Sequence, residues 1–423
     1  MRKRAALIVS LLTIAACSSG ADDTADTAGS TSTPDAPAST DAEPAPDVTD
    51  PPNTDPPATE PPNTEPAATE PPATDPPVTD PPTTEPPEAQ VIAADLAGPG
   101  PYAVGVVTRA LPEGNLVEVW YPADETSRGG TVSYTVRSFL PPAIGDLVPD
   151  TVDDTRTIDA TRDATPDATG PFPIVLFSHG STSFRLQSSV LAQHLASWGI
   201  VTASTDHPSR DLLNAIGGTT EGQPPSVDDF RSLRTLLTTF DDDPVLGGVL
   251  DNSRVALGGH SAGGGTIVQM AGDDGILGYV SYASGLGDAA PEVPSMFMAG
   301  ELDMIVDPVE RTAAAFDAAP SPSWLWSFAD SGHLAFSDLC AVGTEGATLI
   351  DLAEAAGLGA LVDDRLRSLG TDGCEAPNRP VEDVWPGMHQ GATGFYRWVF
   401  GIDAEPIGLD ESAVTTGITV TAK

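Results

Sequence analysis

The stretch that decides the fold is Gly259-His260-Ser261-Ala262-Gly263. It follows a strand-like segment, residues 254–258, and precedes a helix-like segment, residues 264–270. A strand that turns sharply into a helix places the central serine in a strained conformation with its hydroxyl exposed, and the turn needs small residues on both sides. The chain has 41 glycines, so the pattern alone is weak. Ser261 is therefore a candidate nucleophile. The assignment depends on whether the sequence also contains a general base, an orienting acid and oxyanion donors.

A serine nucleophile needs a general base, and only His333 and His389 follow Ser261 in the sequence. His333 comes after an apolar, aromatic run, residues 324–329, which predicts a last strand with the imidazole on the loop beyond it. Loops at the carboxyl ends of parallel strands carry the chemistry of such sheets. We therefore predict that His333 is the base. We place His389 between loop residues 385–388 and the closing helix, with a structural role.

The strand-to-helix turn at Ser261 is a candidate nucleophile elbow. The carboxylate that orients the base should lie in the sequence between this elbow and the His333 loop. Residues 294–300 predict a strand, and Glu301, Asp303 and Asp307 follow it. Asp303, just past the strand end, is the predicted acid. Glu301 and Asp307 remain alternatives, although loop acids in so acidic a chain are usually solvated.

Acyl transfer also needs backbone N–H donors that are fixed in advance around the oxyanion. One is expected from the residue after the nucleophile, Ala262, and the other from the loop after an earlier strand. Residues 172–178 predict that strand, and His179, Gly180 and Ser181 follow it. Ser181 is therefore the second predicted donor. We expect His179 to brace this loop without a catalytic role.

Three further segments carry a resemblance to a known superfamily: Leu176-Phe177-Ser178-His179-Gly180, Leu195-Ala196-Ser197-Trp198-Gly199 and Thr205-Asp206-His207-Pro208. Together with the elbow they resemble α/β hydrolases, in particular platelet-activating-factor acetylhydrolases, dienelactone-hydrolase-like esterases and cutinase-type polyester hydrolases. The resemblance covers residues 98–402. It implies an α/β-hydrolase fold, with a mostly parallel central sheet and helices on both faces. The composition of the residues before it predicts a disordered tail in front. The resemblance also implies hydrolysis of carboxylic esters by Ser261, His333 and Asp303.

The position of the acid separates these families. In the acetylhydrolases it follows the strand directly after the elbow helix, but residues 279–285 contain no acid and Asp288 is the first to follow. The place of Asp303 resembles that in dienelactone-like and polyester hydrolases. A serine esterase is the main expectation, with a phospholipid deacetylase of the acetylhydrolase type or a polyester hydrolase as alternatives. A peptidase, an acyltransferase and a cell-surface adhesin with a relic hydrolase fold remain as rivals.

The beginning of the chain predicts export. Residues 1–4 are basic, residues 5–16 are apolar but too short to span a bilayer, and Ile14-Ala15-Ala16-Cys17 resembles a bacterial lipobox. We expect a lipoprotein signal peptide at residues 1–17 and a lipid anchor at Cys17 on the outer face of the bacterial cell membrane. The alternative is an ordinary secretory signal, after which the protein is secreted.

Residues 18–97 contain no Lys, Arg or aromatic residue and cannot build a core. Acids recur at every fifth position between Asp50 and Glu85, mostly before two prolines, so we expect an extended, self-repelling stalk or else a tolerated spacer. The formal charge of the whole chain is −42, so we expect no nucleic acid partner, and anionic surfaces are poor partners. The partners expected are a small ester or lipid substrate and, through Cys17, the membrane.

Residues 98–423 are the predicted catalytic domain, which we expect to be a monomer. Once Cys17 carries lipid, Cys340 and Cys374 remain as a pair in an oxidising compartment, and we expect a disulfide between them. It would brace the loop of His333, seven residues before Cys340. Two thiols without clustered histidines predict no metal site, and we expect no cofactor.

The remaining pattern predicts strands at 116–121, 174–177 and 200–204, and helices at 186–198 and 230–240. Ser226 and Asp229 resemble a capping box for the second helix. Residues 394–400 should begin or form the last helix. Two insertions, 131–170 and 340–386, either cover the active site or form surface excursions.

Overall fold

The computed structural model describes residues 96–423, except 286, 288–290, 344–347 and 415. The predicted signal peptide, Cys17, the stalk up to residue 95 and Asp288 lie outside the described residues. Within the described part of the chain, no helix combines the length and hydropathy needed to cross a membrane.

Ten strands of the described chain form one sheet in the order β12-β11-β10-β9-β8-β6-β7-β2-β1-β5. The strands from β7 to β11 in this order pair in parallel, whereas β1 with β2, β2 with β7, and β11 with β12 pair antiparallel. The strands of the main sheet are β1 (Ala103–Ala110), β2 (Leu116–Ala123), β5 (Thr161–Arg162), β6 (Phe172–Ser178), β7 (Val201–Thr205), β8 (Leu250–His260), β9 (Ile276–Tyr282), β10 (Ser295–Gly300), β11 (Ser323–Phe328) and β12 (Ile418–Ala422). A separate pair consists of β3 (Val132–Thr135) and β4 (Thr155–Ile158).

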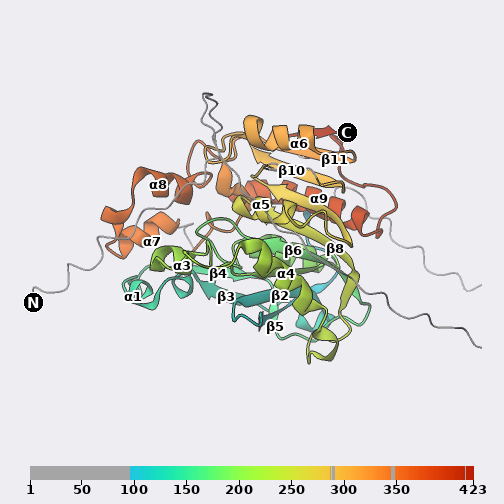
Figure 1. The fold of residues 1–423 in the computed structure, drawn as a ribbon, viewed down its shortest axis with the longest axis horizontal. Coiled ribbons are helices and arrows are strands. Elements are labelled where there is room, and N and C mark those ends of the chain that lie inside the picture. The colour runs from blue at the N-terminus through green and yellow to red at the C-terminus, as the bar shows by residue number, and fades with distance from the viewer. Residues whose placement is uncertain (1–95, 286, 288–290, 344–347, 415) are drawn as a thin grey trace, which may run out of the picture. The chain divides into compact units, whose positions relative to one another are not determined.

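Helices cover both faces of the sheet (Figure 1). The helices of the described residues are α1 (Pro142–Gly145), α2 (Ser189–Ser197), α3 (Leu212–Gly217), α4 (Ser226–Leu237), α5 (Ala262–Val268), α6 (Ala314–Ala318), α7 (Leu349–Ala355), α8 (Asp364–Thr371) and α9 (Val381–Val399). On one face, Val175 and Phe177 of β6 share a core with residues of α2 and α9. On the other, Ile174 and Leu176 share a core with residues of α4, α5 and α6. Since β6 is buried on both faces, its sequence is a continuous apolar run.

These layers confirm the predicted α/β-hydrolase fold, but the start of α4 differs from the prediction. Pro225 is the N-cap residue and Ser226 is already inside the helix, without a capping hydrogen bond. The prediction of a capping box is wrong, because the side chain of Asp229 has other hydrogen-bond partners. Its carboxylate accepts hydrogen bonds from Asn115 and His207.

The last helix is longer than predicted. α9 begins at Val381 and contains Pro386, so His389 lies within a helix and not at a loop. Pro386 is on the exposed face of α9, whereas Val384, Met388, Ala392 and Phe395 form a buried stripe at helical spacing. Burial of this stripe outweighs the helix hydrogen bond that the proline removes. His389 stacks on His194 of α2, with ring centroids 3.9 Å apart, which agrees with a structural role.

Both insertions contribute to the walls of one pocket at the carboxyl ends of the strands. The first insertion contains β3, α1 and β4, and the second contains α7 and α8. The predicted disulfide is present between Cys340 and Cys374, whose Cα atoms are 4.9 Å apart. It closes the second insertion, so that the end of α8 is held close to the segment that follows His333.

Candidate active site

Ser261 occupies the turn between β8 and α5, with φ +54° and ψ −122°. This backbone conformation is strained for a residue other than glycine. The turn is tight because its flanking segments nearly touch. A Cβ atom on Gly259 would lie 2.5 Å from the carbonyl carbon of Gly263, and one on Gly263 would lie 1.9 Å from the carbonyl oxygen of Ser178. The two glycines therefore allow α5 to start directly against the end of β6.

His333 and Asp303 are joined by a hydrogen bond from Nδ1 to Oδ2, 2.8 Å long. Both side chains are buried. The other carboxylate oxygen of Asp303 accepts hydrogen bonds from the backbone N–H groups of Ile305 and Val306, at 2.8 and 2.7 Å. These contacts fix the carboxylate, which in turn fixes the orientation of the imidazole.

The two alternative acids of the same loop have other surroundings. Glu301 and Asp307 are exposed. Asp307 caps the helical turn that follows it, where its Oδ1 accepts hydrogen bonds from the N–H groups of Val309 and Glu310. Of these three carboxylates, the structure brings Asp303 together with His333.

Ser261 and His333 line the same pocket, together with Gly180 and Ser181. A Cβ atom on Gly180 would lie 3.3 Å from that of Ser261, so the loop after β6 passes directly beside the candidate nucleophile. Ser181 is exposed at this loop. In the described part of the chain, the backbone N–H groups of Ser181 and Ala262 have no hydrogen-bond partner.

A chain of hydrogen bonds that no sequence pattern indicates connects the Gly180 loop to the His333 loop. The N–H of Gly180 donates to Oε1 of Gln187 at 2.7 Å. The side-chain amide of Gln187 donates to Nδ1 of His260 at 2.8 Å, and Nε2 of His260 donates to the carbonyl oxygen of His333 at 2.9 Å. Burial lowers the pKa of His260 to about 3, so the ring is neutral and has the one donor and one acceptor that this chain requires.

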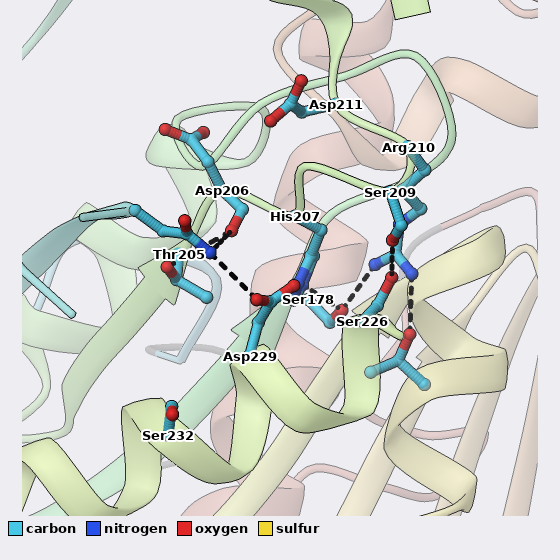
Figure 2. A network of polar contacts seen from close by, with 12 residues as sticks. Ser178, Thr205, Asp206, His207, Ser209, Arg210, Asp211, Ser226, Asp229 and Ser232 are labelled. Carbon is cyan, nitrogen blue, oxygen red and sulfur yellow. Dashed lines mark hydrogen bonds and ion pairs between the residues drawn. The ribbon is translucent and has the colours of Figure 1, made fainter. Parts of the chain in front are cut away.

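A second network includes Arg210, Ser178, His207 and Asp229 (Figure 2). Arg210 donates hydrogen bonds to Oγ of Ser178, to the carbonyl oxygen of His179 and to Oγ1 of Thr266, each at 2.7 Å. Its own carbonyl oxygen accepts the N–H of Thr182 at 2.8 Å. Arg210 thus holds both sides of the loop that carries Ser181 and connects it to α5. The sequence gives no periodicity or motif that singles out Arg210.

His207 and Asp229 complete this network. Nε2 of His207 lies 2.9 Å from Oγ of Ser178, and its Nδ1 lies 3.2 Å from Oδ2 of Asp229. Burial holds the pKa of His207 well below its usual range and raises that of Asp229 to about 7. Burial also lowers the pKa of Arg210 to about 9, against the opposing effect of Asp229 and Asp211, so the guanidinium stays charged at neutral pH.

His179 is buried between the two networks. Its Nδ1 contacts the carbonyl oxygen of Gly180 at 2.8 Å, and its Nε2 accepts the N–H of His207 at 3.2 Å. These contacts fit the expected bracing role. Burial lowers its pKa far below the usual range, so this histidine is neutral.

The described residues have an α/β-hydrolase fold, with a mostly parallel central sheet and helices on both faces. The family model described as platelet-activating factor acetylhydrolase, isoform II, matches residues 111–229. No curated protein that was compared with the chain matches it. The likeness supports a hydrolase of the lipase or esterase type that acts on esters. The matched segment contains the Ser181 loop and Arg210, whereas Ser261, Asp303 and His333 lie beyond it.

The contacts of the two loop acids lead to a matched test. Asp303→Asn should lower kcat/KM for p-nitrophenyl butyrate on the order of 10⁴-fold, because an amide at this position favours the wrong imidazole tautomer. Asp307→Asn, in the same loop, should stay within a few-fold of the wild type. Steady-state kinetics of the three proteins checks both expectations. A severe loss for Asp307→Asn with a mild loss for Asp303→Asn would move the acid to Asp307.

Proposed function

We propose that the protein hydrolyses carboxylic esters through an acyl-enzyme formed on Ser261. The observation that carries this proposal is the buried Asp303–His333 pair at the pocket where Ser261 stands at a strained strand-to-helix turn. Such a turn exposes the serine hydroxyl, and an oriented imidazole is the base that a serine nucleophile needs.

In the first half of the reaction, Oγ of Ser261 attacks the acyl carbon while Nε2 of His333 takes the hydroxyl proton. The carbonyl electron pair moves to its oxygen, and the N–H groups of Ser181 and Ala262 donate to this oxyanion. When the tetrahedral intermediate collapses, the bond to the alcohol oxygen breaks and His333 gives its proton to the leaving alcohol. Asp303 stays ionised and holds the imidazole in the correct tautomer.

In the second half, water replaces the alcohol. His333 takes a proton from the water as its oxygen attacks the acyl carbon, and the same N–H groups stabilise the second oxyanion. Collapse of this intermediate breaks the bond to Oγ, and the proton returns to Ser261. The products are a carboxylic acid and the free enzyme.

Arg210, Gln187 and His260 are positioning residues in this scheme. Arg210 fixes the loop of Ser181 against α5, whose first residue is Ala262. Gln187 and His260 connect the same loop to the backbone of His333. The two oxyanion donors and the base are therefore held by continuous hydrogen-bond chains, which is the preorganisation that electrostatic catalysis requires.

We further propose that the enzyme acts outside the cell as a monomer, either anchored through a lipid at Cys17 or secreted. The basic and apolar residues 1–16 followed by the Cys17 lipobox support export. The disulfide between Cys340 and Cys374 also supports it, because such bonds persist in oxidising compartments.

The direct test of the proposal is Ser261→Ala. The variant should lose turnover of p-nitrophenyl butyrate by several orders of magnitude, as triad serines do. Its thermal melting should change little. Ser253→Ala, an exposed serine at the other end of β8, is the matched control and should keep wild-type kinetics. Retention by Ser261→Ala of more than about a tenth of wild-type activity would contradict this mechanism.

The network of Arg210 gives a separate prediction. Arg210→Lys keeps the charge but cannot reach three acceptors, so kcat should fall on the order of 10²-fold, as when one oxyanion donor is lost. KM should change little, and the affinity for a boronic acid analogue of the tetrahedral intermediate should fall in parallel with kcat/KM. Arg231→Lys, a half-exposed arginine on α4, should behave as the wild type.

If Arg210 only stabilised the fold, the Arg210→Lys variant would give a different result. Active-site titration would then find fewer active molecules, each with normal kcat and normal affinity for the boronic acid. That result would remove Arg210 from the list of positioning residues and leave the Ser261 mechanism untouched.

A further inference from the structure

Ser261 lines a pocket of about 170 Å³ whose walls come from the two insertions, α3 and the loops of Gly180 and His333. Figure 1 shows α1, α3, α7 and α8 gathered on the same side of the fold. Its polar residues, such as Ser181, Gln187 and His333, also belong to the candidate active site. The rest of the wall is apolar, so the cavity has a polar end at Ser261 and an apolar body. We call this apolar body the chamber.

The chamber is lined by branched aliphatic side chains. They include Leu140 and Ile144 from the first insertion, Leu212 from α3, and Leu349, Leu352 and Leu366 from the second insertion. Among the described residues that line the pocket there is no Asp, Glu, Lys, Arg, Phe, Tyr or Trp. A phosphate or ammonium group would lose its hydration here without gaining a charged partner. An aromatic acyl group would find no ring to stack on.

The apolar surface continues outside the chamber. Leu147, Leu213 and Ile216 are 50%, 45% and 45% exposed. Leu147 precedes Val148 of the wall. Ile216 of α3 lines the pocket and also reaches the surface, and Leu213 is on the same helix. α1 and α3 meet here, because a Cβ atom on Gly217 would lie 3.7 Å from Cγ of Pro141. A hydrocarbon chain that enters along this rim stays in contact with apolar side chains.

We propose that the chamber binds the aliphatic acyl chain of a neutral ester, so that the enzyme prefers medium to long acyl chains over acetyl. This inference rests on the proposed function, because it assigns one part of the substrate of that reaction. The acyl group stays bound to Ser261 until water attacks, whereas the alcohol must leave as soon as the acyl-enzyme has formed. A chamber with aliphatic walls next to Ser261 suits the part that stays.

Hydrogen bonds hold the second insertion to the loops of Asp303 and His333. Because this wall of the chamber is fixed in place, a larger side chain on it should displace the bound acyl chain. Asp372, at the end of α8, accepts the N–H of Met304 with Oδ2 at 2.8 Å. Its carbonyl oxygen accepts the N–H of Leu334, also at 2.8 Å. These two contacts are next to Asp303 and His333. The disulfide at Cys374 closes the same segment.

The test uses two positions on α7. Ala353 lines the chamber, whereas Ala355, on the same helix, is exposed and outside it. The substrates are the p-nitrophenyl esters of acetate, butyrate, octanoate and laurate. In the wild type, kcat/KM should rise from acetate to octanoate by up to about fourfold per buried methylene. In Ala353→Trp the ratio of octanoate to acetate kcat/KM should fall at least about tenfold. Ala355→Trp should keep the wild-type ratio.

The ratio does not depend on the fraction of folded enzyme, and Ala353→Leu provides a milder variant should the tryptophan prevent folding. A second series, ethyl acetate against octyl acetate, varies the alcohol and should show the smaller dependence on chain length. The proposal is overturned if acetate is the best acyl substrate of the wild type, or if Ala353→Trp lowers both rates equally. It is also overturned if chain length matters only in the alcohol series.

Failure of this proposal can be told apart from failure of the proposed function. A fluorophosphonate that labels the wild type but not Ser261→Ala, together with turnover that ignores acyl length, would leave the esterase and remove the chamber assignment. Absence of both labelling and ester turnover would remove the esterase itself.

Discussion

The close approach of α5 to the end of β6 is the constraint on which the site depends. Gly263 leaves no room for a side chain next to the carbonyl oxygen of Ser178, and Gly259 leaves none next to Gly263. This packing forces Ser261 into its positive φ and places the first N–H of α5 beside the loop after β6. Arg210 spans the same contact, where it donates hydrogen bonds to Ser178, His179 and Thr266.

The register of the parallel strands brings the other groups to this place. Ser178 of β6 pairs with Gly259 of β8, so the loop of Ser181 begins next to Ser261. Gly300 of β10 pairs with Phe328 of β11, so the loops of Asp303 and His333 also begin side by side. Each loop follows the carboxyl end of its strand, which is where open α/β sheets bind ligands. A hydrogen bond between Asp303 and His333 is the direct consequence.

The strands and the elbow were predictable because their signals are local. β6 and β10 are buried along their whole length and therefore read as apolar runs, and the predicted acid and base follow such runs at short distances. The disulfide followed from the number of cysteines in a chain whose first residues predict export. The start of α9 was not predictable, because Pro386 and Gly387 suggest a loop and only the packing of Val384 and Met388 shows the helix.

The polar networks could not be predicted from the sequence, because their members are far apart along the chain. Gln187 meets His260 and His260 meets His333 across 73 residues in each case, and His207 meets Asp229 from a separate element. No spacing in the sequence encodes such pairs, since they depend on the order of strands in the sheet. The capping box at Ser226 failed for the same reason, because Asp229 turns toward His207 and not toward the helix start.

The most direct test of the account is a crystal structure of the enzyme after reaction with an alkyl fluorophosphonate. We expect phosphorus bonded to Oγ of Ser261 and the phosphonyl oxygen within hydrogen-bond distance of the N–H groups of Ser181 and Ala262. The alkyl chain should lie among the aliphatic side chains of the chamber. A phosphonyl oxygen that points away from both N–H groups, or an adduct on a different residue, would contradict this expectation.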